Sequence, residues 1–125
     1  MIPDFIIEEI EALRGAGYKV EVIEAEGWFN VVFTSYPLPS GYNKPATDLL
    51  ARLPLSYRNG KPDMFWTDTD LRLQNGGTPR SADSVEQALG KQWRRFSWHA
   101  QNWNPATDNL STYLEFVNRR LAQAV

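Results

Sequence analysis

The sequence predicts an α+β fold in which helices cover an antiparallel sheet. Three observations lead to this class: helical periodicity near each end of the chain, strand-like alternation between them, and a length typical of one domain. Of the 125 residues, 42% are hydrophobic and 13% are aromatic, which is enough apolar material for one core. We therefore expect a single domain spanning residues 1–125.

The N-terminal part of the chain predicts a helix followed by a hairpin. Over residues 3–14 an apolar stripe recurs at helical spacing, formed by Phe5, Ile6, Ile10 and Leu13. Pro3 suits the start of this helix, and Gly15 or Gly17 can end it. The period then changes to two in "YKVEVIEAEGWFNVVFTSYPLP", where Gly27 marks a turn between two strands rich in β-branched and aromatic residues.

The middle of the chain is broken by prolines and glycines, so its elements are shorter. We interpret "TDLLARLPL" as a third strand and "DMFWTDTDLRL" as a fourth, because turn residues flank them. The composition of "QNGGTPR" is typical of a loop. "SADSVEQAL" predicts a short helix, with Asp83 and Glu86 at capping-box spacing and Gly90 at its C-terminal side.

The last element has the clearest pattern and predicts a helix over residues 107–124. Its apolar positions recur at helical spacing: Leu110, Tyr113, Leu114, Val117 and Leu121. Thr107 or Asp108 can cap the start, and Arg119 and Arg120 suit the negative end of the helix dipole. The predicted order is therefore an N-terminal helix, a four-stranded antiparallel meander, an irregular segment and a C-terminal helix.

Composition and charge argue against several classes of function. A net charge of −2 and a pI near 5.4 give no electrostatic case for nucleic-acid binding. No apolar run is long enough for a membrane span, and the basic start of a signal peptide is missing, so we expect a cytoplasmic protein. The chain has no cysteine, which excludes disulfides, thiolate metal sites and cysteine nucleophiles. Asp63, Asp68 and Asp70 do not converge if they alternate along a strand, so we expect no metal or cofactor.

Two segments carry a resemblance to a known family. "LPLSYRNGKPDMFWT" (53–67) resembles the proline–aromatic turn that leads into the fourth strand of ubiquitin-conjugating (UBC-like) enzymes, although Arg58 stands where a proline is usual. "QNWNPATDNLSTYLEFVNRRL" (101–121) is similar to the family's Trp-x-Pro segment before the helix that follows the active site. With "PLPSGYN" and "FSWHAQNWNPATDNLSTYL", the chain resembles the prokaryotic conjugating-enzyme-like group encoded beside bacterial ubiquitin-like proteins.

This resemblance implies a UBC-like fold with an irregular active-site flap, and a role in carrying or positioning a ubiquitin-like protein for transfer. It also implies partners: the ubiquitin-like protein, an activating-enzyme-like protein and a metallopeptidase of the deubiquitinase type. The chain departs from the family because it lacks both the cysteine that carries the donor and the family's His-Pro-Asn tripeptide. Another nucleophile has taken over, or a substitution has removed the cysteine, or the protein is a non-catalytic relative.

The reactive position can be counted from either side of the flap. With the short spacing of the resembling family, counting forward from the fourth strand leads to Ser81. Counting back from Trp103 by a similar spacing leads to residues 95–97. Ser97 and His99 point the same way in an extended segment, and an imidazole within hydrogen-bond reach can activate a serine for oxyester formation. We expect both residues at the surface, between the short helix predicted for "SADSVEQAL" and the final helix. The plainer interpretation is a hydrogen-bonded structural histidine beside turn or cap serines.

Three functions remain open at this point. The first is a conjugating-enzyme-like carrier or scaffold, and the second is a catalytically inactive UBC-like binding module. The third is a free-standing hydrolase that uses Ser97 and His99, which is weakened because no orienting acid has an evident position in the sequence.

Overall fold

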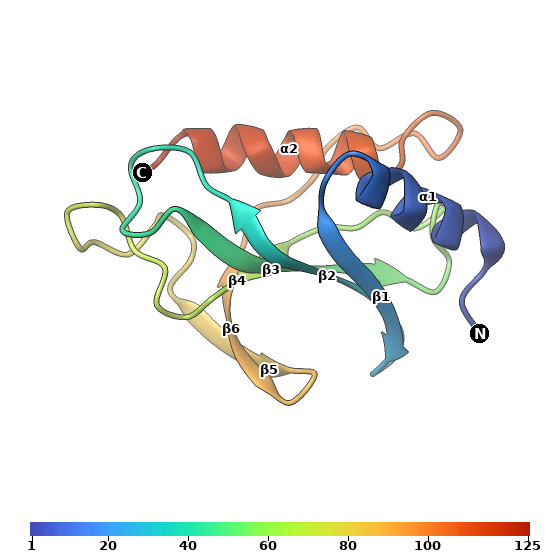
Figure 1. Cartoon of the computed structure of the whole chain (residues 1–125), viewed down its shortest axis with the longest axis horizontal. Coiled ribbons are helices and arrows are strands. Elements are labelled where there is room, and N and C mark those ends of the chain that lie inside the picture. Colours follow the sequence, from blue (N-terminus) through green and yellow to red (C-terminus); the bar gives the residue numbers. More distant parts are fainter.

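Two helices and six strands make up the computed structural model, which describes residues 1–125 (Figure 1). They are α1 (Asp4–Gly15), β1 (Lys19–Ala25), β2 (Trp28–Pro37), β3 (Ala46–Pro54), β4 (Phe65–Thr67), β5 (Ser84–Ala88), β6 (Lys91–Phe96) and α2 (Leu110–Ala122). The strands form one antiparallel sheet in the order β1-β2-β3-β4-β6-β5. The α+β class is confirmed, and the sheet has six strands where the sequence predicted four.

Both helices lie on the same face of the sheet (Figure 1). Each contributes its predicted apolar stripe to one large core, and alternate strand residues supply the other side. The buried residues of the strands on this face are Val20, Phe29, Val31, Phe33, Tyr36, Leu49, Ala51, Leu53, Phe65 and Phe96. The period-two pattern read from the sequence therefore describes a sheet with one face covered by helices. No helix is long and apolar enough to cross a membrane.

The predicted β1–β2 hairpin is confirmed, and its turn has a local cause. Glu26 and Gly27 have φ of 58° and 81°, which is the conformation of a tight two-residue hairpin turn that matches strand twist. The buried Asn30 amide donates to the carbonyls of Ile23 and Ala25, at 3.0 Å each. This side chain thus satisfies carbonyl groups at the end of the hairpin.

The short helix predicted for "SADSVEQAL" is wrong, because this segment forms β5 and pairs with β6. Leu89 and Gly90 have φ of 54° and 73°, so Gly90 belongs to a second tight hairpin turn and does not end a helix. The Glu86 carboxylate accepts from Trp66 Nε1 at 2.9 Å and from Arg95 at 2.8 Å instead of completing a cap. Strand pairing and these two partners override the local capping pattern.

The β5–β6 hairpin also changes the sheet face that lies away from the helices. In Figure 1 the hairpin curves beneath the rest of the sheet. The backbone N–H of Leu89, at its tip, donates to the Glu26 carboxylate in the β1–β2 turn at 3.2 Å. A second apolar cluster forms on this face, with Leu50, Ala88 and Trp93 buried. This face therefore has a small core of its own.

The C-terminal helix begins slightly later than predicted. Its cap is Asn109, so the expectation of Thr107 or Asp108 at this position is wrong. Asn109 Oδ1 accepts from the Thr112 N–H at 3.1 Å, and Thr112 Oγ1 accepts from the Asn109 N–H at 2.9 Å. Asp108 instead accepts from the Asn104 N–H at 2.7 Å and closes the turn before the helix.

The two segments that carry the family resemblance meet beside α1. Trp103 Nε1 donates to the Arg58 carbonyl at 2.8 Å, and its ring lies 6.1 Å from the Tyr57 ring. The Glu9 carboxylate of α1 accepts from the Tyr57 hydroxyl and from the Leu110 N–H at the start of α2, each at 2.8 Å. A carboxylate is favourable at a helix N-terminus, so Glu9 joins three parts of the chain.

Candidate functional site

The two serines found by counting from opposite ends of the flap lie side by side. We define the flap as residues 68–109, between β4 and α2. The Ser97 N–H donates to the Ser81 carbonyl at 2.8 Å, and the β5–β6 hairpin leaves and returns between these two residues. The two counts lead to different residues because the β5–β6 hairpin is inserted between Ser81 and Ser97. The fold brings these two serines into contact.

The first arm of the flap, residues 79–82, is held by two buried arginines that donate to its backbone carbonyls. Arg120 of α2 donates to the Arg80 carbonyl at 2.8 Å, and Arg94 of β6 donates to the Ala82 carbonyl. Together with the Ser97 N–H, these donors occupy three consecutive carbonyl groups. The backbone around Ser81 is therefore tied to the sheet, to α2 and to the start of the second arm.

Both of these arginines are buried, and neither forms an ion pair with an Asp or Glu side chain. Arg94 is 4% exposed and Arg120 is 1% exposed. Burial lowers the pKa of each guanidinium from its usual range, and in Arg120 the rings of Phe96 and Trp98, at 5.2 and 4.7 Å, supply favourable cation–π contacts. The first arm thus lies over two positive charges whose hydrogen bonds go to backbone carbonyls.

Ser81 itself is exposed, and its hydroxyl makes no hydrogen bond within the protein. Its φ is 60°, in the left-handed region that costs a non-glycine residue about 1 kcal/mol. Such a conformation persists when the surrounding structure fixes the backbone. Here the hydrogen bonds to the carbonyls of residues 80, 81 and 82 fix it. The first arm presents a hydroxyl on a rigid backbone, with no base bonded to it.

The second arm, residues 97–100, is held by its side chains in addition to the backbone bond from Ser97. Ser97 Oγ accepts from Arg95 Nε at 2.9 Å, and Arg95 also pairs with Glu86. His99 Nδ1 lies 2.8 Å from Asp63 Oδ2, with the two side chains 55% and 39% exposed. His99 is at the surface and Ser97 is half-buried, and each side chain has a partner of its own rather than the other.

Asp63 is the residue that sequence reasoning missed as the acid that orients His99. The two lie 36 positions apart, so no local spacing connects them. The structure joins their segments a second time, because Lys61 donates to the Ala100 carbonyl. The buried Tyr113 hydroxyl of α2 donates to the Asp63 carbonyl at 2.6 Å. In the sequence, Asp63 stands out only as one of three carboxylates, with Asp68 and Asp70, along a predicted strand.

Those other two carboxylates have partners at the far side of β4. Lys44 Nζ lies 3.0 Å from Asp68 Oδ2 and 2.8 Å from Asp70 Oδ1, and Lys91 also reaches Asp68. Burial alone would raise the pKa of Asp68, but hydrogen bonds from Lys44, Lys91 and a backbone N–H lower it overall. No group of three or more His, Cys, Asp or Glu side chains is placed to hold a metal ion.

Two pockets adjoin the dyad of Asp63 and His99, and only the first of them is lined by residues of the second arm. The first, of about 370 Å³, separates the arm from α2, and His99 is part of its wall together with Trp98, Trp103 and Phe116. The second, of about 380 Å³, lies on the sheet face away from the helices and includes Asp63, Arg95, Trp28, Arg52 and Trp66. The imidazole therefore faces one pocket while its acid partner faces the other.

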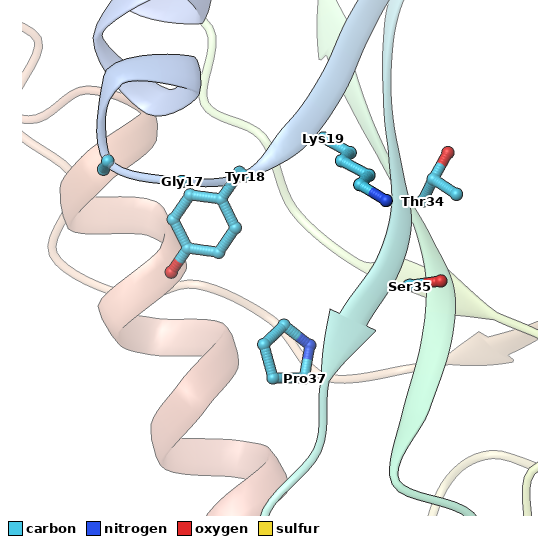
Figure 2. Close-up of a pocket in the computed structure, with 7 residues that line it drawn as sticks. Gly17, Tyr18, Lys19, Thr34, Ser35 and Pro37 are labelled. Carbon is cyan, nitrogen blue, oxygen red and sulfur yellow. The ribbon is translucent and has the colours of Figure 1, made fainter.

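A third hollow, of about 400 Å³, shares no residue with either arm (Figure 2). It lies where the loop after α1 approaches the end of β2. Lys19 extends toward its cross-strand neighbour Thr34, and the rings of Tyr18 and Pro37 border the other side (Figure 2). No carboxylate or imidazole lines this hollow, so it offers no acid–base pair for chemistry.

Comparisons with known proteins give one finding. No curated protein and no solved structure matches the chain. A family model described as prokaryotic E2 family E matches residues 7–124, which cover α1 from residue 7 onward, all six strands, both arms of the flap and the whole of α2. The chain therefore belongs to prokaryotic E2 family E and is a conjugating-enzyme-like protein.

Proposed function

We propose that this protein positions a ubiquitin-like protein for transfer in a bacterial modification pathway, as the conjugating-enzyme-like component. Its family membership supports the general role. The observation that carries the proposal is the meeting of Ser81 and Ser97 through a backbone hydrogen bond. The resemblance to conjugating enzymes predicts the reactive residue at this part of the flap. A chain without cysteine thereby presents hydroxyl groups where a thiol is expected.

Ser97 is the better of the two hydroxyls for a covalent link. Its Oγ already accepts from the Arg95 guanidinium at 2.9 Å, and a positive donor beside this oxygen stabilises an alkoxide. The Ser81 hydroxyl has no such donor. An acyl group on Ser97 is an oxyester, in which an alkoxide replaces the thiolate leaving group.

The proposal includes two partners: an activating-enzyme-like protein that supplies the activated ubiquitin-like protein, and the ubiquitin-like protein itself. A metallopeptidase of the deubiquitinase type would remove the modification. These partners follow from the family's role, and the arms of the flap are the region where we expect the tail of the ubiquitin-like protein to arrive.

Reconstitution tests this function directly. The protein is incubated with ATP and with an activating-enzyme-like protein and a ubiquitin-like protein of the same organism, and adducts are resolved by denaturing electrophoresis and mass spectrometry. We expect an adduct that resists mild thiol, is cleaved by hydroxylamine, and disappears in Ser97→Ala. Ser111→Ala, which removes an exposed hydroxyl of α2, is the matched control and should retain the adduct. An adduct that persists in Ser97→Ala contradicts the assignment of Ser97.

A second function, a catalytically inactive binding module, is favoured by one specific observation. Neither Ser81 nor Ser97 has its hydroxyl bonded to His99, whose Nδ1 is occupied by Asp63. This function predicts a stable complex with the ubiquitin-like protein and no adduct under any condition. Size-exclusion chromatography of the same mixtures separates the two, because the carrier gives a covalent species and the module gives only a complex.

A further inference from the structure

The chain's only histidine is held in a defined orientation by a carboxylate from a distant segment. Asp63 Oδ2 lies 2.8 Å from His99 Nδ1, and this contact favours the tautomer with the proton on Nδ1. Asp63 is itself fixed through its backbone, because the Tyr113 hydroxyl donates to its carbonyl at 2.6 Å. The Nε2 atom is left with its lone pair, and the ring stands at the wall of the pocket beside α2.

The hydroxyl oxygen of Ser97, in the same arm as His99, is bonded to a cation. Arg95 Nε donates to Ser97 Oγ at 2.9 Å, and the Glu86 carboxylate holds the other end of the guanidinium at 2.8 Å. A base with a free lone pair and a donor on a hydroxyl oxygen are two of the parts that acyl transfer requires. Ser97 and His99 lie two residues apart on the second arm, and Arg95 lies in β6, immediately before this arm.

We infer that Asp63, His99 and Arg95 form the acid–base machinery for transfer of an acyl group from Ser97, a role that rests on the proposed function. A primary amine attacks the acyl carbon, the new N–C bond forms, and His99 Nε2 takes the proton released by the amine. The C–Oγ bond breaks, Ser97 Oγ leaves with the electron pair, and Arg95 stabilises the alkoxide. His99 then returns the proton to Oγ, which restores the hydroxyl. Asp63 is a positioning residue, and it acts by holding the imidazole.

The same base must act in the reverse direction, by microscopic reversibility. When an activated ester acylates Ser97, His99 removes the hydroxyl proton. This gives a probe that requires no protein partner: p-nitrophenyl acetate, with the acetylated residue located by peptide mass spectrometry. We expect the acetyl group on Ser97, and none at this position in Ser97→Ala. His99→Gln should slow the acetylation of Ser97 by about 100-fold, which is the scale of general-base catalysis.

The role of Asp63 has an independent spectroscopic readout. Because there is one histidine, long-range ¹H–¹⁵N spectra at pH 8.5 report the tautomer of His99 without ambiguity. We expect the proton on Nδ1 in the natural protein. In Asp63→Ala, which keeps the backbone carbonyl bonded to Tyr113, the proton should move largely to Nε2, and acetylation should slow as well. Asp83→Ala removes an exposed carboxylate of the flap and should change neither readout.

The outcomes separate this inference from the proposed function. A proton on Nε2 in the natural protein, an unchanged tautomer in Asp63→Ala, or acetylation of Ser97 at the same rate in His99→Gln would each overturn the dyad. Neither measurement uses the ubiquitin-like protein. Failure of the reconstitution with both readouts as expected would therefore leave an acyl-accepting dyad and reject the pathway.

Discussion

The two arms of the flap differ in the groups that hold them: the first arm is hydrogen-bonded only through its backbone, whereas the second is bonded through both its backbone and its side chains. In the first arm, residues 79–82, the backbone carbonyls are bound by Arg94, Arg120 and the second arm, while the Ser81 side chain is free. In the second arm, residues 97–100, the side chains are bound and the outermost of them is exposed. Buried backbone bonds give rigidity, whereas exposed charged pairs give orientation with little stability.

This difference gives the two arms different roles: the first is a rigid structural support, and the second carries the groups that we propose for acyl transfer. The first arm can be rigid because its donors are buried in the main core, but it has no base bonded to its hydroxyl. The second arm carries the exposed imidazole of His99, and its Ser97 hydroxyl accepts from the guanidinium of Arg95 in β6. We therefore expect substitutions below the first arm to affect folding, and substitutions on the second arm to affect transfer.

The largest expected effect is on the support of the first arm. Arg120→Ala should lower the free energy of unfolding by about 2–4 kcal/mol, because it opens a cavity beside Phe96 and leaves the Arg80 carbonyl without its donor. Urea denaturation measures the loss. The neighbouring Arg119 is exposed, so Arg119→Ala should stay within about 0.5 kcal/mol of the natural protein. Equal losses of unfolding free energy in the two variants would show that the buried Arg120 does not stabilise the first arm.

A smaller effect is expected on the second arm. His99→Ala should lower the free energy of unfolding by less than about 1 kcal/mol, because its pair with Asp63 is more than one third exposed at both ends. Transfer should nevertheless be lost. Thermal melting together with the adduct assay checks both parts. A loss of more than about 2 kcal/mol would make His99 a packing residue, and the contrast between the arms would disappear.

The smallest expected effect distinguishes the two serines by backbone conformation. Ser81→Gly relieves a φ of 60° but adds freedom to the unfolded chain, so stability should stay unchanged or rise by up to about 1 kcal/mol. Ser97 has no positive φ, and Ser97→Gly should lower stability by about 0.5–1 kcal/mol. The two variants are compared by urea denaturation. A loss in Ser81→Gly as large as that in Ser97→Gly would mean that the first arm is not strained.

Much of the fold could be predicted from the sequence, because the relevant signals are local. The apolar stripes of α1 and α2 and the alternation of β1 and β2 are properties of neighbouring residues, and they led to the α+β class. Prediction was wrong where two structures fit the same local pattern. The acid at capping spacing in 81–89 suited a helix, but Glu86 found Trp66 and Arg95 across the sheet.

The apolar stripes of α1 and α2, the first hairpin, the absence of a thiol, and the two serines reached by counting are all evident in the sequence. Three other features depend on tertiary packing: Ser81 and Ser97 touch, Asp63 holds His99, and Arg94 and Arg120 are buried under the first arm. The cause is distance along the chain. Periodicity shows which face a residue lies on, whereas contacts between residues 16, 36 or 40 positions apart depend on how the strands pair and where α2 packs.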